Sequence, residues 1–438
     1  MDWQLPLLLI LGGLLVLMML GMPVAFAFLL VSVVAAFFVW GGETGLRALI
    51  NSLSVSVTVF TLLPLPLFVL MGEVLFHSQA APLMIDTLDK WLGRLPGRLS
   101  LEAVVGGTLI STLTGASISS VAMLGSVLIP EMEKRGYKKP MTLGPIVGSG
   151  GLATMIPPSG LGVLLAAVGL LSIGRMLIAI IIPGLLMAFF YAGYVVIRCR
   201  LQPSIAPVYE IPHTPLSEKL IDTLRYILPV GFVVFLVTGF IFLGIATPTE
   251  AAACGSVGAF ILAVYYRRLN WEVVKKAVLA SIGITGMMFI ILAGATSFSE
   301  LLAFSGASRG LSQFFISLPV APVLIIVAME FVILILGMFM NTGPVIMITV
   351  PLFMPVVKAL GFNPLWFGVI TLLNVEMALT TPPFGMNLFV MKGVAPPGTT
   401  LGDIIRAGLP FLGCDLITMV LLFAFPQLTL WLPALMRG

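Results

Sequence analysis

The sequence predicts an all-α polytopic membrane protein built as an inverted repeat of two halves. Composition is the first observation: 59% of the 438 residues are hydrophobic and only 9% are charged, whereas a soluble chain averages about 25% charged. The second is a pair of Pro-Pro motifs, Pro157-Pro158 and Pro382-Pro383, each inside a long apolar run. The third is the clustering of Lys and Arg in a few loops, which sets the orientation of the spans.

Twelve apolar segments follow one another along the chain, which is enough for about ten spans of ~20 residues. They cover residues 4–20, 24–40, 60–76, 101–130, 141–171, 176–197, 226–244, 249–266, 282–299, 322–356, 365–395 and 409–432. Between them lies one long polar, proline-rich connection. We therefore expect a first repeat over 1–198, a cytoplasmic connection over 199–225 and a second repeat over 226–438. Surface-lying amphipathic helices are expected over 46–57 and 269–281.

Two of these segments are expected to form re-entrant hairpins. Basic residues flank segment 101–130 on both sides, so in a topology with both chain ends outside the cytoplasm it enters and leaves on one face. It is too long for one span and has Gly115 in its middle, which suits a helical hairpin. Segment 322–356, with Gly343 in its middle, is its counterpart. Each half then crosses the membrane five times and adds one hairpin. Because five is an odd number of crossings, the second half starts on the opposite side and is inverted relative to the first.

The Pro-Pro motifs predict two broken helices, over about 141–171 and 365–395. Proline removes a backbone donor and frees carbonyl groups, which membrane helices tolerate only where they face protein or a wet cavity. The two motifs lie 225 positions apart, and Gly160 with Gly385 repeats the same spacing. Broken helices at corresponding places in two halves indicate the binding site of a transporter.

Short polar clusters at the hairpin tips supply the candidate ligands. Neutral Ser, Thr and Asn oxygens, together with freed carbonyls, suit a small hard cation such as Na⁺. One sodium site is expected at Ser111, Gly115, Ala116 and Gly150, and a second at Gly337, Met340, Asn341, Gly343 and Thr380. An anionic substrate is expected beside the restarting helix N-termini, at Ser117, Ser119, Ser159, Asn341 and Thr342. The alternative is that these residues only pack helices together.

Acidic residues keep a second mechanism open. Glu330 lies in an arm of the second hairpin, and Glu376 lies five residues before Thr381. A charge at bilayer depth is costly and is a functional candidate. These residues would serve a proton-coupled organic-anion carrier that works without partners; alternatively they lie near segment ends or face another subunit. An ion channel or a scaffold that transports nothing is the remaining alternative.

The sequence lacks the motifs of three activities: direct coupling to ATP, zinc proteolysis and serine hydrolysis. No GxxxxGK[ST] phosphate loop, HExxH zinc motif or GxSxG nucleophile motif occurs in the sequence. The three cysteines, Cys199, Cys254 and Cys414, form no CxxC. We therefore expect neither an enzyme nor an organic cofactor, and the net charge of +4 requires no nucleic acid.

The chain resembles the large membrane subunit of a tripartite ATP-independent periplasmic (TRAP) transporter. The resemblance covers essentially the whole chain and is carried by residues 114–137 (TGASISSVAMLGSVLIPEMEKRGY), Ile156-Pro-Pro-Ser159, Ala246-Thr-Pro-Thr-Glu-Ala251 and residues 374–387 (NVEMALTTPPFGMN). It implies a Na⁺-driven, elevator-type importer in the bacterial inner membrane, with periplasmic termini and with the hairpins and broken helices as the moving unit.

The same resemblance implies two partners and a class of substrate. The partners are a small four-helix membrane subunit and a soluble periplasmic binding protein, and the substrate is a small organic anion, a carboxylate or a sulfonate. Many family members carry Asp where this chain has Asn341. This chain therefore has one negative charge fewer beside its expected second sodium site.

Overall fold

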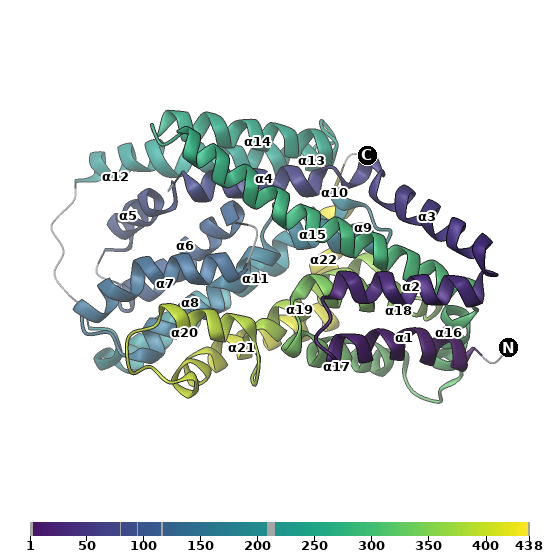
Figure 1. The fold of residues 1–438 in the computed structure, drawn as a ribbon. Coiled ribbons are helices and arrows are strands. Elements are labelled where there is room, and N and C mark those ends of the chain that lie inside the picture. The colour runs from purple at the N-terminus through teal and green to yellow at the C-terminus, as the bar shows by residue number, and fades with distance from the viewer. Residues whose placement is uncertain (1–2, 79, 94, 115–116, 208–214, 437–438) are drawn as a thin grey trace.

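Helices form the whole of the ordered secondary structure in the part of the chain that the computed structural model describes, residues 3–78, 80–93, 95–114, 117–207 and 215–436 (Figure 1). No strand occurs in these residues. The expected all-α class is therefore confirmed.

The first half of the chain contains eleven α-helices among its described residues. They are α1 (Gln4–Met19), α2 (Val24–Val39), α3 (Glu43–Val57), α4 (Pro64–His77, preceded by the short η1, Phe60–Leu62), α5 (Ala80–Leu92), α6 (Arg98–Thr114), α7 (Ser117–Lys134), α8 (Lys139–Met155), α9 (Gly160–Val168), α10 (Ile173–Ala179) and α11 (Ile181–Leu201). The short η2 (Pro203–Ile205) follows α11.

The second half also contains eleven α-helices among its described residues. It contains α12 (Leu216–Asp222), the π-helical turn η3 (Thr223–Ile227), α13 (Leu228–Phe242), α14 (Pro248–Tyr265), α15 (Trp271–Phe304), α16 (Ala307–Ser317), α17 (Pro322–Phe339), α18 (Thr342–Ala359), α19 (Pro364–Thr380), α20 (Met386–Val394), α21 (Leu401–Ala424) and α22 (Gln427–Ala434).

Helix starts recur at nearly constant spacing between the halves. The pairs α2 and α14, α6 and α17, α7 and α18, α8 and α19, and α9 and α20 begin 224 to 226 positions apart. This spacing agrees with the 225 positions that separate the Pro-Pro motifs. The exact boundaries of the repeats and their opposite orientation in the membrane stay predictions.

The helices include enough long apolar segments for a multi-pass membrane protein. Eight helices among the described residues are long and apolar enough to cross a bilayer, and nine if the bent pair α8 and α9 counts as one span. Three shorter apolar helices, α1, α2 and α19, come in addition. Large apolar side chains remain exposed along the outer helices, as a lipid-facing surface requires.

The two halves are interlaced at the centre of the molecule. The helix α6 packs on α8, and α17 packs on α19. In addition, α7 of the first half packs on α20 of the second, while α18 of the second half packs on α9 of the first. Every residue of α8 from Met141 to Met155 and of α19 from Trp366 to Thr380 is buried, so these two helices are the most buried part of the core.

One element differs from the sequence-based expectation. The expected separate surface helix over 269–281 is the first part of α15, a continuous helix of 34 residues that crosses the molecule diagonally in Figure 1. The corresponding stretch of the first half contains Pro64 and Pro66 and is split into α3 and α4, whereas α15 contains no proline. Without a residue that removes a backbone donor, the helix continues. The other expected helix, over 46–57, is present as α3.

Candidate functional site

The Pro-Pro motifs interrupt their helices as the sequence predicts. The helix α8 ends at Met155 and α9 begins at Gly160, and the two are bent by 47°. Likewise α19 ends at Thr380 and α20 begins at Met386. Both Pro-Pro bonds are cis. The two breaks follow the C-terminal ends of α8 and α19, the two most buried helices, and lie beside the starts of α7 and α18.

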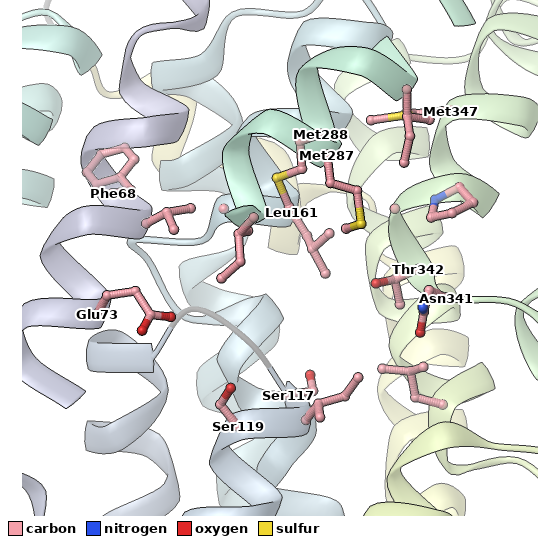
Figure 2. A pocket seen from close by; sticks show the side chains of 18 of the residues that line it. Phe68, Glu73, Ser117, Ser119, Leu161, Met287, Met288, Asn341, Thr342 and Met347 are labelled. Carbon is pink, nitrogen blue, oxygen red and sulfur yellow. The ribbon is translucent and has the colours of Figure 1, made fainter. Parts of the chain in front are cut away.

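A cavity of about 320 Å³ lies between these breaks and the long helices α4 and α15 (Figure 2). Residues of both halves line it. Its polar lining comes from Glu73, Ser117, Ser119, Asn341 and Thr342, while Phe68, Met287, Met288 and Met347 belong to its apolar wall. The cavity is thus bounded by the starts of α7 and α18 and by the helices α4 and α15.

Four of the five residues expected to contact substrate line this one cavity. Ser117 and Ser119 come from the start of α7, and Asn341 and Thr342 from the start of α18. Although Ser119 and Asn341 are 222 positions apart, Figure 2 shows both facing the same space. The hydroxyl of the fifth residue, Ser159, caps α9 instead, accepting a hydrogen bond of 3.1 Å from the Gly162 amide.

The first expected sodium site is only partly described. Gly115 and Ala116 lie outside the described residues, as does the side chain of Ser111. Gly150 is described and packs closely on α7: a Cβ placed on it would lie 3.2 Å from the carbonyl oxygen of Ser117 and would overlap Val121. A residue without a side chain is thus needed here to bring α8 against the backbone at the start of α7.

The residues of the second expected sodium site come from three helix ends that meet. Gly337 lies in the last turn of α17, so close to α19 that a Cβ on it would lie 2.5 Å from the Cβ of Ala378. Met340 and Asn341 connect α17 to α18, which carries Gly343. At the end of α19, the Thr380 hydroxyl donates to the carbonyl oxygen of Met377 at 2.9 Å. These residues therefore offer oxygen atoms of the kind that coordinate hard cations, and none of the expected ligands is charged.

Glu376 connects the two halves directly beside the cavity. Its Oε2 accepts hydrogen bonds from the hydroxyls of Ser117, at 2.7 Å, and Thr154, at 2.5 Å. Its Oε1 accepts from the amide of Asn387 at 3.4 Å. All four side chains are buried. The carboxylate of α19 thus holds the first residue of α7, which itself lines the cavity.

This cluster contains residues that sequence reasoning missed. Thr154 and Asn387 were not among the expected site residues, although each lies within a few residues of a Pro-Pro motif. The other candidate acid, Glu330, is also buried and lies elsewhere. It accepts hydrogen bonds of 2.7 Å from Thr371 and from Asn374, both on α19, and is not part of the cavity lining.

The charge of the cavity wall limits what can stabilise an anion there. Among the described lining residues Glu73 is the only charged one, and its Oε2 lies 3.3 Å from Nε2 of His77. No Lys or Arg belongs to the described lining. An anion in this cavity would depend on hydroxyl and amide donors, on the N-terminal ends of α7 and α18, and on cations bound nearby.

A multi-pass helical protein whose two halves share one central cavity is, by fold and site, a membrane transporter subunit. Solved transporters have the same fold. The YdaH transporter of Alcanivorax borkumensis matches with a TM-score of 0.63 at 16% identity, covering 99% of this chain and 100% of that one. MtrF of Neisseria gonorrhoeae matches with a TM-score of 0.60 at 15% identity, over 87% and 84% of the two chains.

The chain belongs to the tripartite ATP-independent periplasmic transporter family, as a DctM component, with residues 11–428 matching the family model. It is 33% identical to the C4-dicarboxylate TRAP transporter large permease protein DctM of Pseudomonas aeruginosa, over 85% of this chain and 86% of that one. It is 28% identical to the ectoine TRAP transporter large permease protein TeaC of Halomonas elongata, over 95% and 96%.

A third relative is the sialic acid TRAP transporter large permease protein SiaM of Vibrio cholerae, 29% identical over 95% of this chain and 96% of that one. The chain is thus a transporter permease subunit and not an enzyme. In such tripartite systems the large permease works with a periplasmic binding protein and a small membrane subunit.

Proposed function

We propose that this chain is the permease subunit of a Na⁺-coupled secondary transporter that imports a small organic anion, a carboxylate or a sulfonate. A periplasmic binding protein delivers the anion, and a four-helix membrane subunit assembles with the permease in the bacterial inner membrane, with both chain termini in the periplasm. The relatives named for C4-dicarboxylates, ectoine and sialic acid support a small organic substrate without selecting one.

One observation carries the proposal: the starts of α7 and α18 face one cavity, which α4 and α15 also line. Because no basic side chain belongs to the described lining, sodium ions at the tips would supply the positive charge that the anion needs. Hairpins and broken helices would move together as the transporting unit, past a frame that includes α4 and α15. This is the elevator mechanism.

The test begins with the substrate, which is identified by screening the partner binding protein against carboxylates and sulfonates. The full complex is then reconstituted in liposomes, and uptake of the labelled substrate is measured with an inward Na⁺ gradient, an inward proton gradient or neither. Uptake that follows only the Na⁺ gradient and requires the binding protein supports the proposal. Uptake without Na⁺, or without the binding protein, would contradict it.

A proton-coupled carrier that works without partners is the second candidate. The hydrogen bond from Ser117, a cavity residue, to Glu376 supports it, because a proton taken up by Glu376 would change what Ser117 presents to the substrate. Under this alternative the permease alone transports on a proton gradient, and Glu376→Gln abolishes that uptake. Under the main proposal the permease alone does not transport on any gradient.

A further inference from the structure

Two acidic side chains meet where α5 is followed by α6, outside the cavity. Asp89 lies in the last turn of α5 and Glu102 near the start of α6, where it is only 2% exposed. The carboxyl group of Glu102 is in hydrogen-bonding contact with that of Asp89. The second oxygen of Asp89, Oδ2, lies 2.5 Å from a guanidinium nitrogen of Arg98. Two carboxyl groups therefore share one neighbouring cation.

Each of these acids has one buried oxygen that accepts no hydrogen bond from the part of the chain that the structure describes. Among the described residues, no N–H or O–H group donates to Oδ1 of Asp89 or to Oε2 of Glu102. Buried oxygens of this kind are almost always paired, because an unpaired one keeps the full cost of its lost hydration. A protonated carboxyl group is a donor. One proton between Glu102 and Asp89 therefore satisfies both oxygens.

The surrounding charges also favour a bound proton. Asp86 and Asp89 of α5 and Arg98 of α6 are the described charged groups that act on Glu102. The helices α4, α7, α8 and α11 pack on α6 as well, and none of their described titratable side chains acts on Glu102. The next cation along α5, Lys90, is held by Glu218 and Asp222. Glu102 thus lies among two acids, Asp86 and Asp89, and one cation, Arg98, and like charges in contact cannot all be ionised at low cost.

We propose that Asp89 and Glu102 form a proton-binding site that fastens α5 to α6. Glu102 carries the proton and donates it to Oδ1 of Asp89, while Oδ2 of Asp89 accepts from Arg98. When the proton leaves to water, two carboxylates stand in contact and Arg98 balances only one of them, so the packing of α5 on α6 weakens. Because α5 joins α4 to the hairpin arm α6, the site sets how firmly that arm is held. It is independent of the proposed sodium coupling.

Infrared difference spectroscopy on the purified full-length complex tests the bound proton without a substrate. Between pH 6 and pH 10 the wild-type protein is expected to lose a C=O stretching band of a protonated carboxyl group. In Glu102→Gln this band should be smaller by the share of one carboxyl group, while a donor and an acceptor stay at the same place. Glu131→Gln, which removes a partly exposed carboxylate that pairs with Arg135, is the control and should keep the full band. A band of equal size in Glu102→Gln would overturn the proposal.

Thermal unfolding against pH gives a second, independent measurement. If the folded state holds a proton that the unfolded state releases, stability falls as pH rises above about 4.3, the ordinary pKa of Glu, until the folded site also releases it. The wild-type melting temperature should therefore fall with rising pH more steeply than that of Glu102→Gln. Glu131→Gln should follow the wild type. Equal slopes for the wild type and Glu102→Gln would contradict the proposal, whether or not the complex transports an anion on a Na⁺ gradient.

Discussion

The hydroxyl of Ser117 donates a hydrogen bond of 2.7 Å to the carboxylate of Glu376, a residue 259 positions further along the chain. This bond joins the first hairpin to the second broken helix at the wall of the cavity. Because the proton of Ser117 is used by Glu376, the hydroxyl offers only lone pairs to the cavity. That polarity suits a cation or a donor group of the substrate at this position, rather than a carboxylate oxygen.

Removing the carboxylate of Glu376 should destabilise the protein strongly. In Glu376→Ala the donors of Ser117, Thr154 and Asn387 lose their acceptor, and each buried unpaired donor costs about 1–3 kcal/mol. Glu376→Gln keeps one carbonyl oxygen and should lie between the wild type and the alanine variant. Thermal unfolding of the purified complex measures the order. Glu43→Gln, which removes an exposed ion pair with Arg47, should change stability by less than ~1 kcal/mol.

Gly337→Ala should separate α17 from α19. The added methyl group would lie 2.5 Å from the Cβ of Ala378, well inside van der Waals contact, so one of the two helices must shift. Overpacking of this kind costs about 1–3 kcal/mol, and a displaced helix end should also weaken Na⁺ binding, measured by calorimetric titration. Gly283→Ala adds the same group where nothing lies within 4 Å. An equal loss of stability and of Na⁺ binding in both variants would contradict close packing at Gly337.

Asn341→Asp should raise the affinity for Na⁺. Asn341 lies at the N-terminal end of α18, where its side chain makes no capping bond, and it lines the cavity. A carboxylate there adds charge beside the second expected sodium site and interacts favourably with the helix dipole, by about 0.3–1 kcal/mol. The Na⁺ concentration for half-maximal binding should fall. Asn363→Asp, at the start of α19 and outside the cavity lining, should leave it unchanged.

Joining the moving unit to the frame should stop uptake. Met288 of α15 and Met347 of α18 both line the cavity. Cysteines at both positions, in a background with Cys254→Ser because that native thiol is exposed, can be bridged by a bifunctional thiol reagent. We expect uptake to be lost while Na⁺ binding remains measurable.

The matched control for this experiment lies within the frame. The hydroxyls of Ser52 in α3 and Ser297 in α15 are 3.1 Å apart, so cysteines at these two positions can be linked without joining the frame to the hairpins. That link should leave uptake intact. Uptake that survives the link between Met288→Cys and Met347→Cys would argue against a sliding unit.

Lys90→Met should reveal a weak, salt-dependent contact between α5 and α12. Lys90 lies 2.6 Å from Glu218 and 2.5 Å from Asp222, and these hydrogen bonds raise the pKa of its ammonium group. A raised pKa means that the pairing is fully present below about pH 10.4 and is lost only above it. The stability lost in the variant should therefore be constant from pH 6 to pH 9 and shrink with added salt. A loss that changes across this range would point to another titrating group.

Most helices were predictable because their signals are local. The length of the apolar runs predicted the helical segments, and the Pro-Pro motifs predicted the breaks after Met155 and Thr380. The hairpin tips were predictable as polar clusters, and four of five expected substrate residues line one cavity. The continuity of α15 was missed because Trp271 and a change in polarity look like a boundary, whereas only a proline or a similar break ends a helix there.

The contacts within the site were not predictable in the same way. Thr154 and Glu376 are 222 positions apart. No local sequence pattern predicts that an acid of one half accepts hydrogen bonds from hydroxyls of the other half. Ser159 has a hydroxyl group, as a ligand would, but its oxygen caps α9. Asp89 and Glu102 were not among the expected site residues, because the placement of basic residues predicts the orientation of the helices and not which acids are buried together.

The unbroken α15 has a consequence for the lipid around the protein. At 1.5 Å per residue its 34 residues extend about 51 Å, well beyond a hydrocarbon layer of about 30 Å. Such a helix must lean, or extend into the headgroups, and its angle then depends on the thickness of the bilayer that surrounds it. Since α15 forms one wall of the cavity, thinner and thicker membranes would present that wall at different inclinations, and lipid chain length becomes a variable that acts on transport.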